Sequence, residues 1–471
     1  MRLLFPAVSF LSLIALPLSA LAETVSNEPL DLTGDWVGYA ALGIFVFAYA
    51  LVMTEEFTGL RKSKPVILAA GIIWALIAWT CHRMNLPGQA EAAVRHDLLE
   101  YAELLLFLLV AMTYINAMEE RGVFDALRAW LIRRGFGYRT LFWLTGTLAF
   151  FISPVADNLT TALLMCAVVL SVGGDNHRFV LLSCINIVVG ANAGGAFSPF
   201  GDITTLMVWQ KGVVEFWQFF DLFVPSLVNF LVPALLMQLA IPTARPEGCS
   251  ETVQMRTGAL TVIALFLATI VTAVAFHNFL DLPPVIGMLT GLGYLQLFGF
   301  YLTKRAENNN GRRRRKRNGQ MGDIVPFDVF RSVANAEWDT LLFFYGVVLC
   351  VGGLGFLGYL AIASQVMYTD FGATGANVTI GLLSSIVDNI PVMFAVLTMH
   401  PDMSTGQWLL VTMTAGVGGS LLSIGSAAGV ALMGQARGRY TFFGHLKWAP
   451  AVAVGYAASI GTHMWLNARL F

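Results

Sequence analysis

The chain carries two Asp-Asn pairs inside otherwise apolar sequence. Asp157-Asn158 lies in the segment SPVADN, and Asp388-Asn389 lies in the segment VDNIP, 231 residues further along the chain. Carboxylate and amide oxygens together suit a hard cation such as Na⁺. A carboxylate withdrawn from water also accepts a proton more readily, so the same site can hold H⁺ when the cation is absent. The pairs therefore predict a site for either ion; the structural alternative is that each aspartate caps the second helix of its hairpin.

Small residues interrupt the segment that follows each pair, over 190–210 and 416–435. The glycines concerned are Gly190, Gly194, Gly195, Gly201, Gly416, Gly418, Gly419 and Gly425. We expect them to break a helix, which would free carbonyls for a cation and let the Asp-Asn segment approach closely. Tight helix packing is the structural alternative. The same segments hold further polar candidates, which are Asn192, Ser198, Asp202, Thr204, Thr205, Ser420, Ser423 and Ser426.

Composition indicates that these acids lie in a membrane protein. Hydrophobic residues make up 57% of the 471 residues and charged residues only 12%, where soluble domains carry roughly 25% charged. A soluble enzyme, a disordered protein and a disulfide-stapled secreted domain are therefore excluded. The apolar runs are also far longer than barrel strands of ~9–11 residues, which favours a polytopic all-α protein. Burying an aspartate in a bilayer costs about 2.5–3.5 kcal/mol, so such acids are candidate functional residues.

Apolar length predicts ten single spans and two interrupted segments. The spans are 36–53, 65–80, 100–118, 179–210, 217–240, 258–280, 283–302, 338–360, 407–434 and 448–467. The segments 140–171 and 376–399 contain proline and polar residues near their middle, so we expect re-entrant hairpins whose tips line a cavity. With the start of 36–53 outside, 23 of the 28 basic residues lie inside and 4 outside. That distribution supports the topology of a multi-pass membrane protein.

The predicted topology gives the two halves of the chain opposite orientations. The halves cover 36–240 and 338–471, each with a hairpin followed by a broken helix, and 241–302 holds a linker and connecting helices. Inverted repeats around a midplane site are typical of secondary transporters. In the repeat alignment Asp202 falls opposite Ala428, so it has no acidic counterpart.

Two segments lie outside the predicted spans and halves, namely the N-terminus and the basic loop 303–335. Residues 1–22 have the form of a cleaved signal peptide, with an uncleaved first helix as the alternative. The run 303–320 is predicted to be a flexible cytoplasmic linker that fixes topology, with attraction to anionic lipid as the alternative. No nucleic-acid partner is expected.

Other titratable groups lie near predicted helix ends. Glu337 and Asp339 open one span, and Glu100 and Glu103 open another, where acids usually complement the helix dipole. His96 falls in a predicted outer loop and is a candidate pH sensor.

Five segments together resemble the NhaD-type Na⁺/H⁺ antiporters, within a superfamily that also holds citrate, dicarboxylate and arsenite carriers. They are SPVADNLTTALLM, GANAGGAFSPFGDITTLM, EWDTLLFFYG, SSIVDNIPVMFA and GGSLLSIGSAAGVALMG. The resemblance implies export of Na⁺, and of Li⁺ as a possible second ion, in exchange for H⁺. It also implies a homodimer whose transport domain moves like an elevator. By motif match, the functional set is Ser153, Asp157, Asn158, Asn192, Asp202, Thr204, Thr205, Glu337, Asp339, Ser384, Asp388, Asn389, Ser423 and Ser426.

Three rival functions remain at this point. A sodium-coupled carboxylate importer is disfavoured because an aspartate at both tips would repel its substrate, and an arsenite carrier is the other relative. An intramembrane aspartyl protease would need a Gly-x-Gly-Asp-like sequence, which precedes neither Asp157 nor Asp388.

Overall fold

The computed structural model describes residues 30–174, 176–244, 255–314 and 328–471. These residues form helices and their connections, with no β-strand among them. Nine helices in this part of the chain are long and apolar enough to cross a membrane. The predicted all-α, multi-pass membrane class is therefore confirmed, whereas the predicted signal segment 1–22 lies outside the described residues.

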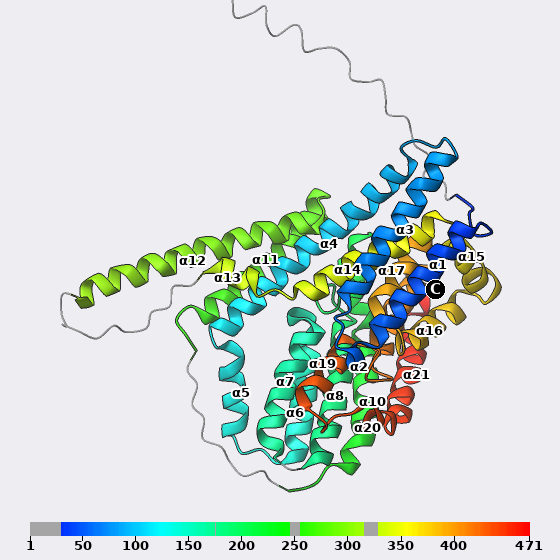
Figure 1. The fold of residues 1–471 in the computed structure, drawn as a ribbon. Helices are drawn as coiled ribbons and strands as arrows, with labels where there is room; N and C mark the ends of the chain where they lie inside the picture. The colour runs from blue at the N-terminus through cyan, green and yellow to red at the C-terminus, as the bar shows by residue number, and fades with distance from the viewer. Residues whose placement is uncertain (1–29, 175, 245–254, 315–327) are drawn as a thin grey trace, which may run out of the picture.

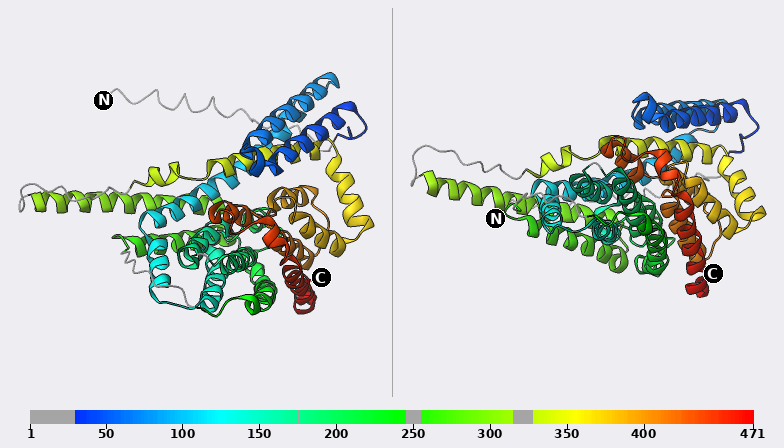
Figure 2. Two further views of the ribbon diagram at one scale, coloured as in Figure 1. Left: turned by 60° about the horizontal axis from the view of Figure 1, so that its bottom comes forward. Right: turned by 90° about the horizontal axis from the view of Figure 1, so that it is seen from below.

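One group of helices forms the long band that crosses the upper part of Figure 1, with α4 and α14 against each other at its centre. Its members are α1 (Trp36–Met53), α2 (Glu55–Thr58), α3 (Ser63–Arg83), α4 (Gln89–Glu120), α11 (Ala259–Leu280), α12 (Pro284–Arg314), α13 (Val329–Ala334) and α14 (Trp338–Phe356). The views in Figure 2 show α12 projecting well beyond the rest of the molecule.

A second group packs below this band. It comprises α5 (Val123–Arg133), α6 (Tyr138–Ala156), α7 (Asn158–Gly173), α8 (His177–Gly195), α9 (Ile203–Gln210), α10 (Phe223–Met237), α16 (Ala373–Ser384), α17 (Asn389–Met399), α18 (Thr405–Gly418), α19 (Ala427–Ala436), α20 (Phe442–Leu446) and α21 (Ala449–Leu466). Short helices, α15 (Tyr359–Ser364) and the π-helical turn Gln365–Asp370, join α14 to α16. Helix α8 is buried on all sides, in agreement with its continuous run of apolar and small residues.

Most predicted spans agree with the observed helices, apart from the interrupted ones and from α4 and α12, which extend beyond the predicted bounds. Span 36–53 coincides with α1, and span 217–240 corresponds to α10 with a 3₁₀ turn at each end. The predicted broken helices are indeed divided, at 196–202 between α8 and α9 and at 419–426 between α18 and α19. The prediction of a loop from 303 onward was wrong for its first part, because α12 continues to Arg314; Lys, Arg and Glu are good helix formers.

The glycine prediction needs a correction. Five of the eight glycines lie within α8 or α18 and interrupt neither helix, namely Gly190, Gly194, Gly195, Gly416 and Gly418. Only Gly201, Gly419 and Gly425 lie in the breaks. A Cβ on Gly194 would lie 2.2 Å from the Phe150 carbonyl oxygen, and one on Gly418 would lie 2.1 Å from the Gly381 carbonyl oxygen. These glycines therefore allow the backbone of α6 or α16 to touch the neighbouring helix, and the breaks begin just after them.

The chain reverses sharply at the two Asp-Asn pairs. Helix α6 ends at Ala156 and α7 begins at Asn158, so Asp157 alone makes the turn, with a φ of +65°. That conformation is strained for a side-chain-bearing residue and persists only where surrounding packing enforces it. The second reversal takes 385–388, between α16 and α17, and Asp388 keeps an ordinary φ of −49°.

Candidate ion-binding site

The two Asp-Asn tips and the two helix breaks meet in the middle of the molecule. Helix α7 packs against α19, α17 packs against α9, and α18 packs against α8 and α9. Residues of both tips, of the first break and of the start of α19, together with side chains of α4 and of the start of α14, line a cavity of about 90 Å³. Asn158 and Asn389, which are 231 residues apart in the chain, thus border one small, partly polar space.

Asp202 lies at the centre of this arrangement. Its Oδ2 atom accepts a hydrogen bond from the amide of Asn158 at 3.0 Å and another from the amide of Asn389 at 3.0 Å. Its Oδ1 atom accepts from the backbone N–H of Thr204 at 3.2 Å and so caps α9. The carboxylate is 5% exposed. The two asparagines that were predicted as separate halves of a site therefore converge on one oxygen atom.

Asn192 extends the network across both breaks. Its Oδ1 accepts from the Asn158 amide at 3.2 Å, and its own amide donates to the Ser420 hydroxyl at 2.8 Å. All of these side chains are buried. Because buried polar groups that are hydrogen-bonded to one another hold each other in place, this network of hydrogen bonds fixes the distance between the two breaks.

The two tip aspartates have different surroundings. Asp157 caps α7, accepting from the Thr160 backbone N–H at 3.4 Å, and it lines the same cavity as Glu337. Asp388 makes no capping bond; its Oδ2 lies 3.6 Å from the Lys62 ammonium. Both aspartates are close enough to Asp202 to interact with its charge. Asp157 and Asp202 therefore line the cavity and Asp388 adjoins it, and the three aspartates differ in their pairing.

The predicted serines and threonines mainly hold backbone. The Ser153 hydroxyl donates to the Ala191 carbonyl at 2.6 Å, and the Ser384 hydroxyl donates to the Ala415 carbonyl at 2.7 Å. Each bond ties the first helix of a tip to the helix before a break. Thr205 donates to the Asp202 carbonyl at 2.7 Å, and Ser426 caps α19 through the Gly429 N–H at 3.2 Å. Thr204 and Ser423 are fully buried beside the breaks.

The two acids at the start of α14 separate. Glu337 lines the cavity, as does Thr340, whose hydroxyl donates to the Glu337 carboxylate at 3.2 Å. Asp339 instead accepts from the Ser63 hydroxyl at 2.5 Å and joins α14 to the start of α3. Glu337 is thus placed to influence an ion in the cavity, whereas the contact of Asp339 is structural.

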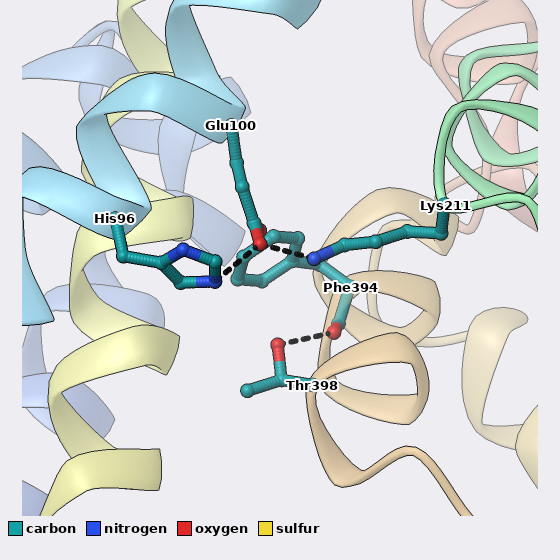
Figure 3. A network of polar contacts seen from close by, with 5 residues as sticks. All are labelled: His96, Glu100, Lys211, Phe394 and Thr398. Atoms are coloured by element: carbon teal, nitrogen blue, oxygen red, sulfur yellow. Dashed lines mark hydrogen bonds and ion pairs between the residues drawn. The ribbon is translucent and has the colours of Figure 1, made fainter. Parts of the chain in front are cut away.

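His96 does not line this cavity; Figure 3 shows its ring pointing toward the carboxylate of Glu100. Its Nε2 is 2.9 Å from a Glu100 carboxylate oxygen that also pairs with the ammonium of Lys211, at the end of α9. These residues line a second cavity of about 290 Å³, with Glu103 and Phe394. His96 belongs to α4, which begins at Gln89, so the predicted outer loop around it was wrong: the helix starts 11 residues before the predicted span at 100.

Sequence reasoning underrated Asp202 and missed Lys62. The sequence places Asp202 only among the further polar candidates of the broken helices, yet it is the acceptor for both asparagines. The available signal was that an acid without a counterpart can serve both halves. Lys62 was counted among the topology-determining charges, and nothing in the triplet of Arg61, Lys62 and Lys64 distinguishes it from its neighbours.

Comparison with known proteins identifies the family. A family model described as a citrate transporter matches residues 39–416. The chain is 60% identical over 477 residues to the Na(+)/H(+) antiporter NhaD of Vibrio cholerae, covering 98% of this chain and 99% of that protein. The chain belongs to the NhaD-type Na⁺/H⁺ antiporters. The NhaD of Alkalimonas amylolytica is 60% identical over 98% of each chain, and sodium/proton antiporter 1 of Arabidopsis thaliana is 30% identical over 98% of this chain and 77% of that protein.

Membership of the NhaD-type antiporters confirms the resemblance seen in the five sequence segments. It also removes the aspartyl-protease alternative, because the relatives are named antiporters rather than enzymes. The family model that matches is named for citrate carriers, so the carboxylate alternative is a matter for direct measurement.

Proposed function

We propose that this protein exports Na⁺, and also Li⁺, from the cytoplasm in exchange for H⁺. The observation that carries the proposal is the buried carboxylate of Asp202, which accepts from the asparagines of both tips. A carboxylate that is buried among neutral amides and near two further acids can lower its charge by binding either a proton or a small cation. The names of the relatives, which include the NhaD antiporters above, support the same pair of ions.

The exchange chemistry follows from what each side chain can offer. An amide presents N–H donors on one side and a carbonyl oxygen on the other, and only the oxygen can ligate a cation. In the described structure Asn158 and Asn389 donate to Asp202, which suits a state without Na⁺. When Na⁺ enters, the amides would turn their oxygens toward the ion, while Asp157 and Asp388 add negative charge. Protonation of the carboxylates would weaken Na⁺ binding and release the ion on the other side.

Access to the two sides in turn would come from movement of one helix group relative to the other. The supporting observation is that the two halves make equivalent contacts at their tips and breaks. Ser153 in the first half corresponds to Ser384 in the second, and Gly194 corresponds to Gly418. Such pairs are what inverted repeats would produce, and inverted repeats with a midplane site are typical of alternating-access carriers. In this proposal the second group of helices, which contains the breaks, moves like an elevator against the band that has α4 and α14 at its centre. The protein would be a homodimer embedded in lipid.

The distribution of basic residues supports the orientation. It places the start of α1 outside, with the start of α3 and of α14 inside, in a bacterial inner membrane. Residues 1–22 would then be a cleaved export signal. The cavity that holds Asp157 and Glu337 also contains Lys62, from the predicted cytoplasmic side, so this state would load Na⁺ from the cytoplasm.

The test is proton movement in everted membrane vesicles. Respiration first acidifies the interior of the vesicles. Adding Na⁺ or Li⁺ should then dissipate the pH gradient in vesicles with the wild-type protein, whereas adding K⁺ or citrate should not. Asp157→Asn and Asp388→Asn should each reduce the response at least about tenfold, since each removes a charge from the site. An undiminished Na⁺ response in Asp157→Asn would contradict the proposed site. A response to citrate would instead favour the carboxylate importer.

The network in Figure 3 supports a separate proposal for His96, as a pH-responsive group outside the ion site. Histidine changes charge between about pH 5 and 8, and a charged His96 would bind Glu100 more strongly in competition with Lys211. Because glutamine cannot carry that charge, we expect His96→Gln to alter the pH profile of exchange while it changes the maximal activity less than about threefold. The pH profile of exchange checks this, with His82→Gln, an exposed histidine of α3, as the control. Identical profiles for His96→Gln and wild type would refute a pH-sensing role.

A further inference from the structure

Lys62 is the one basic side chain among the described residues that line the cavity. It immediately precedes α3, and its ammonium lies 3.6 Å from Asp388 Oδ2 and 4.6 Å from the centre of the Phe343 ring. The side chains of Lys62 and Asp388 are 18% and 16% exposed. An ion pair this far removed from water, with an aromatic face on the same ammonium, is held more firmly than a surface pair.

Asp388 depends on this lysine more than the other acids depend on any single partner. Asp157 caps α7 and Asp202 caps α9, so both carboxylates accept backbone N–H donors. Asp388 makes no such bond at the start of α17, and its Oδ1 is buried without a hydrogen-bond partner among the described residues. A buried carboxylate oxygen that lacks a donor is costly, and a cation placed beside it removes that cost. The Oδ1 atom of Asp388 is thus free to receive a cation.

The charges around the cavity indicate why an internal cation is needed. Asp157, Asp202 and Glu337 line the same space, and Asp388 adjoins it, whereas Lys62 supplies the only positive charge among the described lining residues. A lysine ammonium is a compact monovalent cation on a flexible stem, which makes it the closest side-chain equivalent of Na⁺. Ammonium and Na⁺ would compete for the same carboxylate.

We infer that Lys62 is a tethered counter-cation, which neutralises Asp388 while the site holds no Na⁺ and is displaced when Na⁺ binds. This inference rests on the proposed exchange of Na⁺ for H⁺. Its consequence is that Lys62 weakens Na⁺ binding on the loading side, because the ammonium and the ion compete there for Asp388. Lys62 is a positioning residue in this scheme, since it acts through Asp388.

The test is Lys62→Met, which keeps the apolar stem against Phe343 and removes the charge. Without the competitor, the Na⁺ concentration for half-maximal exchange in everted vesicles should fall about three- to tenfold. Lys62→Arg should restore this concentration toward the wild-type value. Lys64 is an exposed lysine two residues further on, so Lys64→Met should leave the concentration unchanged and controls for the general field of the loop.

A second measurement covers the case in which Lys62→Met no longer transports. Na⁺ should then raise the thermal unfolding temperature of the purified variant at about three- to tenfold lower concentrations than it does for wild type. A half-saturating Na⁺ concentration that is unchanged or higher in this assay would overturn the inference and leave Lys62 as an anchor for α3. Wild-type vesicles without Na⁺-dependent proton release would instead refute the proposed function, so the two failures are distinguishable.

Discussion

Replacing Asp202 with asparagine should abolish Na⁺-dependent proton release, with a loss of at least about 100-fold. The variant leaves the amides of Asn158 and Asn389 facing a third amide, so two hydrogen bonds to a charged acceptor are lost. Each such bond contributes about 1.5–3 kcal/mol, and 2.8 kcal/mol corresponds to about 100-fold. The variant also lacks the one carboxylate that both tips contact, so neither ion has its central ligand. Everted-vesicle measurements with Na⁺ and with Li⁺ check this result.

Two matched variants separate loss of charge from loss of fold. Asp202→Glu keeps the carboxylate but pushes it about one bond further into a small cavity, so it should retain a weak response with an altered Na⁺ dependence. Asp402→Asn, at an exposed position after α17, should transport like wild type. If Asp202→Asn exchanged Na⁺ for H⁺ at wild-type rates, the central role of this carboxylate would be wrong.

The second large effect is expected from Gly194→Val, a residue that touches no ion. A Cβ there would lie 2.2 Å from the carbonyl oxygen of Phe150 and 2.9 Å from its carbonyl carbon. Both are backbone atoms of α6, so the clash can be relieved only by moving α6 away from α8. Overpacking of this kind costs about 1–3 kcal/mol and occasionally more. Moving α6 would also displace the tip at Asp157, so both thermal stability and transport should fall.

Unfolding temperature of the purified protein and exchange in vesicles measure the two consequences. Gly43→Val is the control, because Gly43 lies on the exposed side of α1 with no atom near its Cβ position. Gly43→Val changes the helix propensity by the same amount as Gly194→Val but introduces no clash with a neighbouring backbone. Equal stability losses in the two variants would show that the contact between α6 and α8 is not what requires glycine.

Much of the helical organisation was predictable because a bilayer imposes strong and simple rules. The span at 36–53, the interrupted segments around Asp157 and Asp388, and the two divided helices all follow from apolar length and the cost of polar residues at depth. The end of α12 and the start of α4 were misjudged, since helices can extend beyond the membrane into sequence that hydropathy does not distinguish from a loop.

The sequence by itself determined the membrane class, the family and the candidate groups: two Asp-Asn tips, two small-residue breaks and a few acids in apolar surroundings. Those conclusions rest on composition and spacing, which are local. Only the tertiary structure decided which groups meet. Both asparagines bond to Asp202, and Lys62 rather than a backbone donor pairs with Asp388. The physical reason is that charge pairing acts over a few ångströms between segments as much as 326 residues apart, Lys62 and Asp388 among them. Spacing along the chain carries no record of such distances.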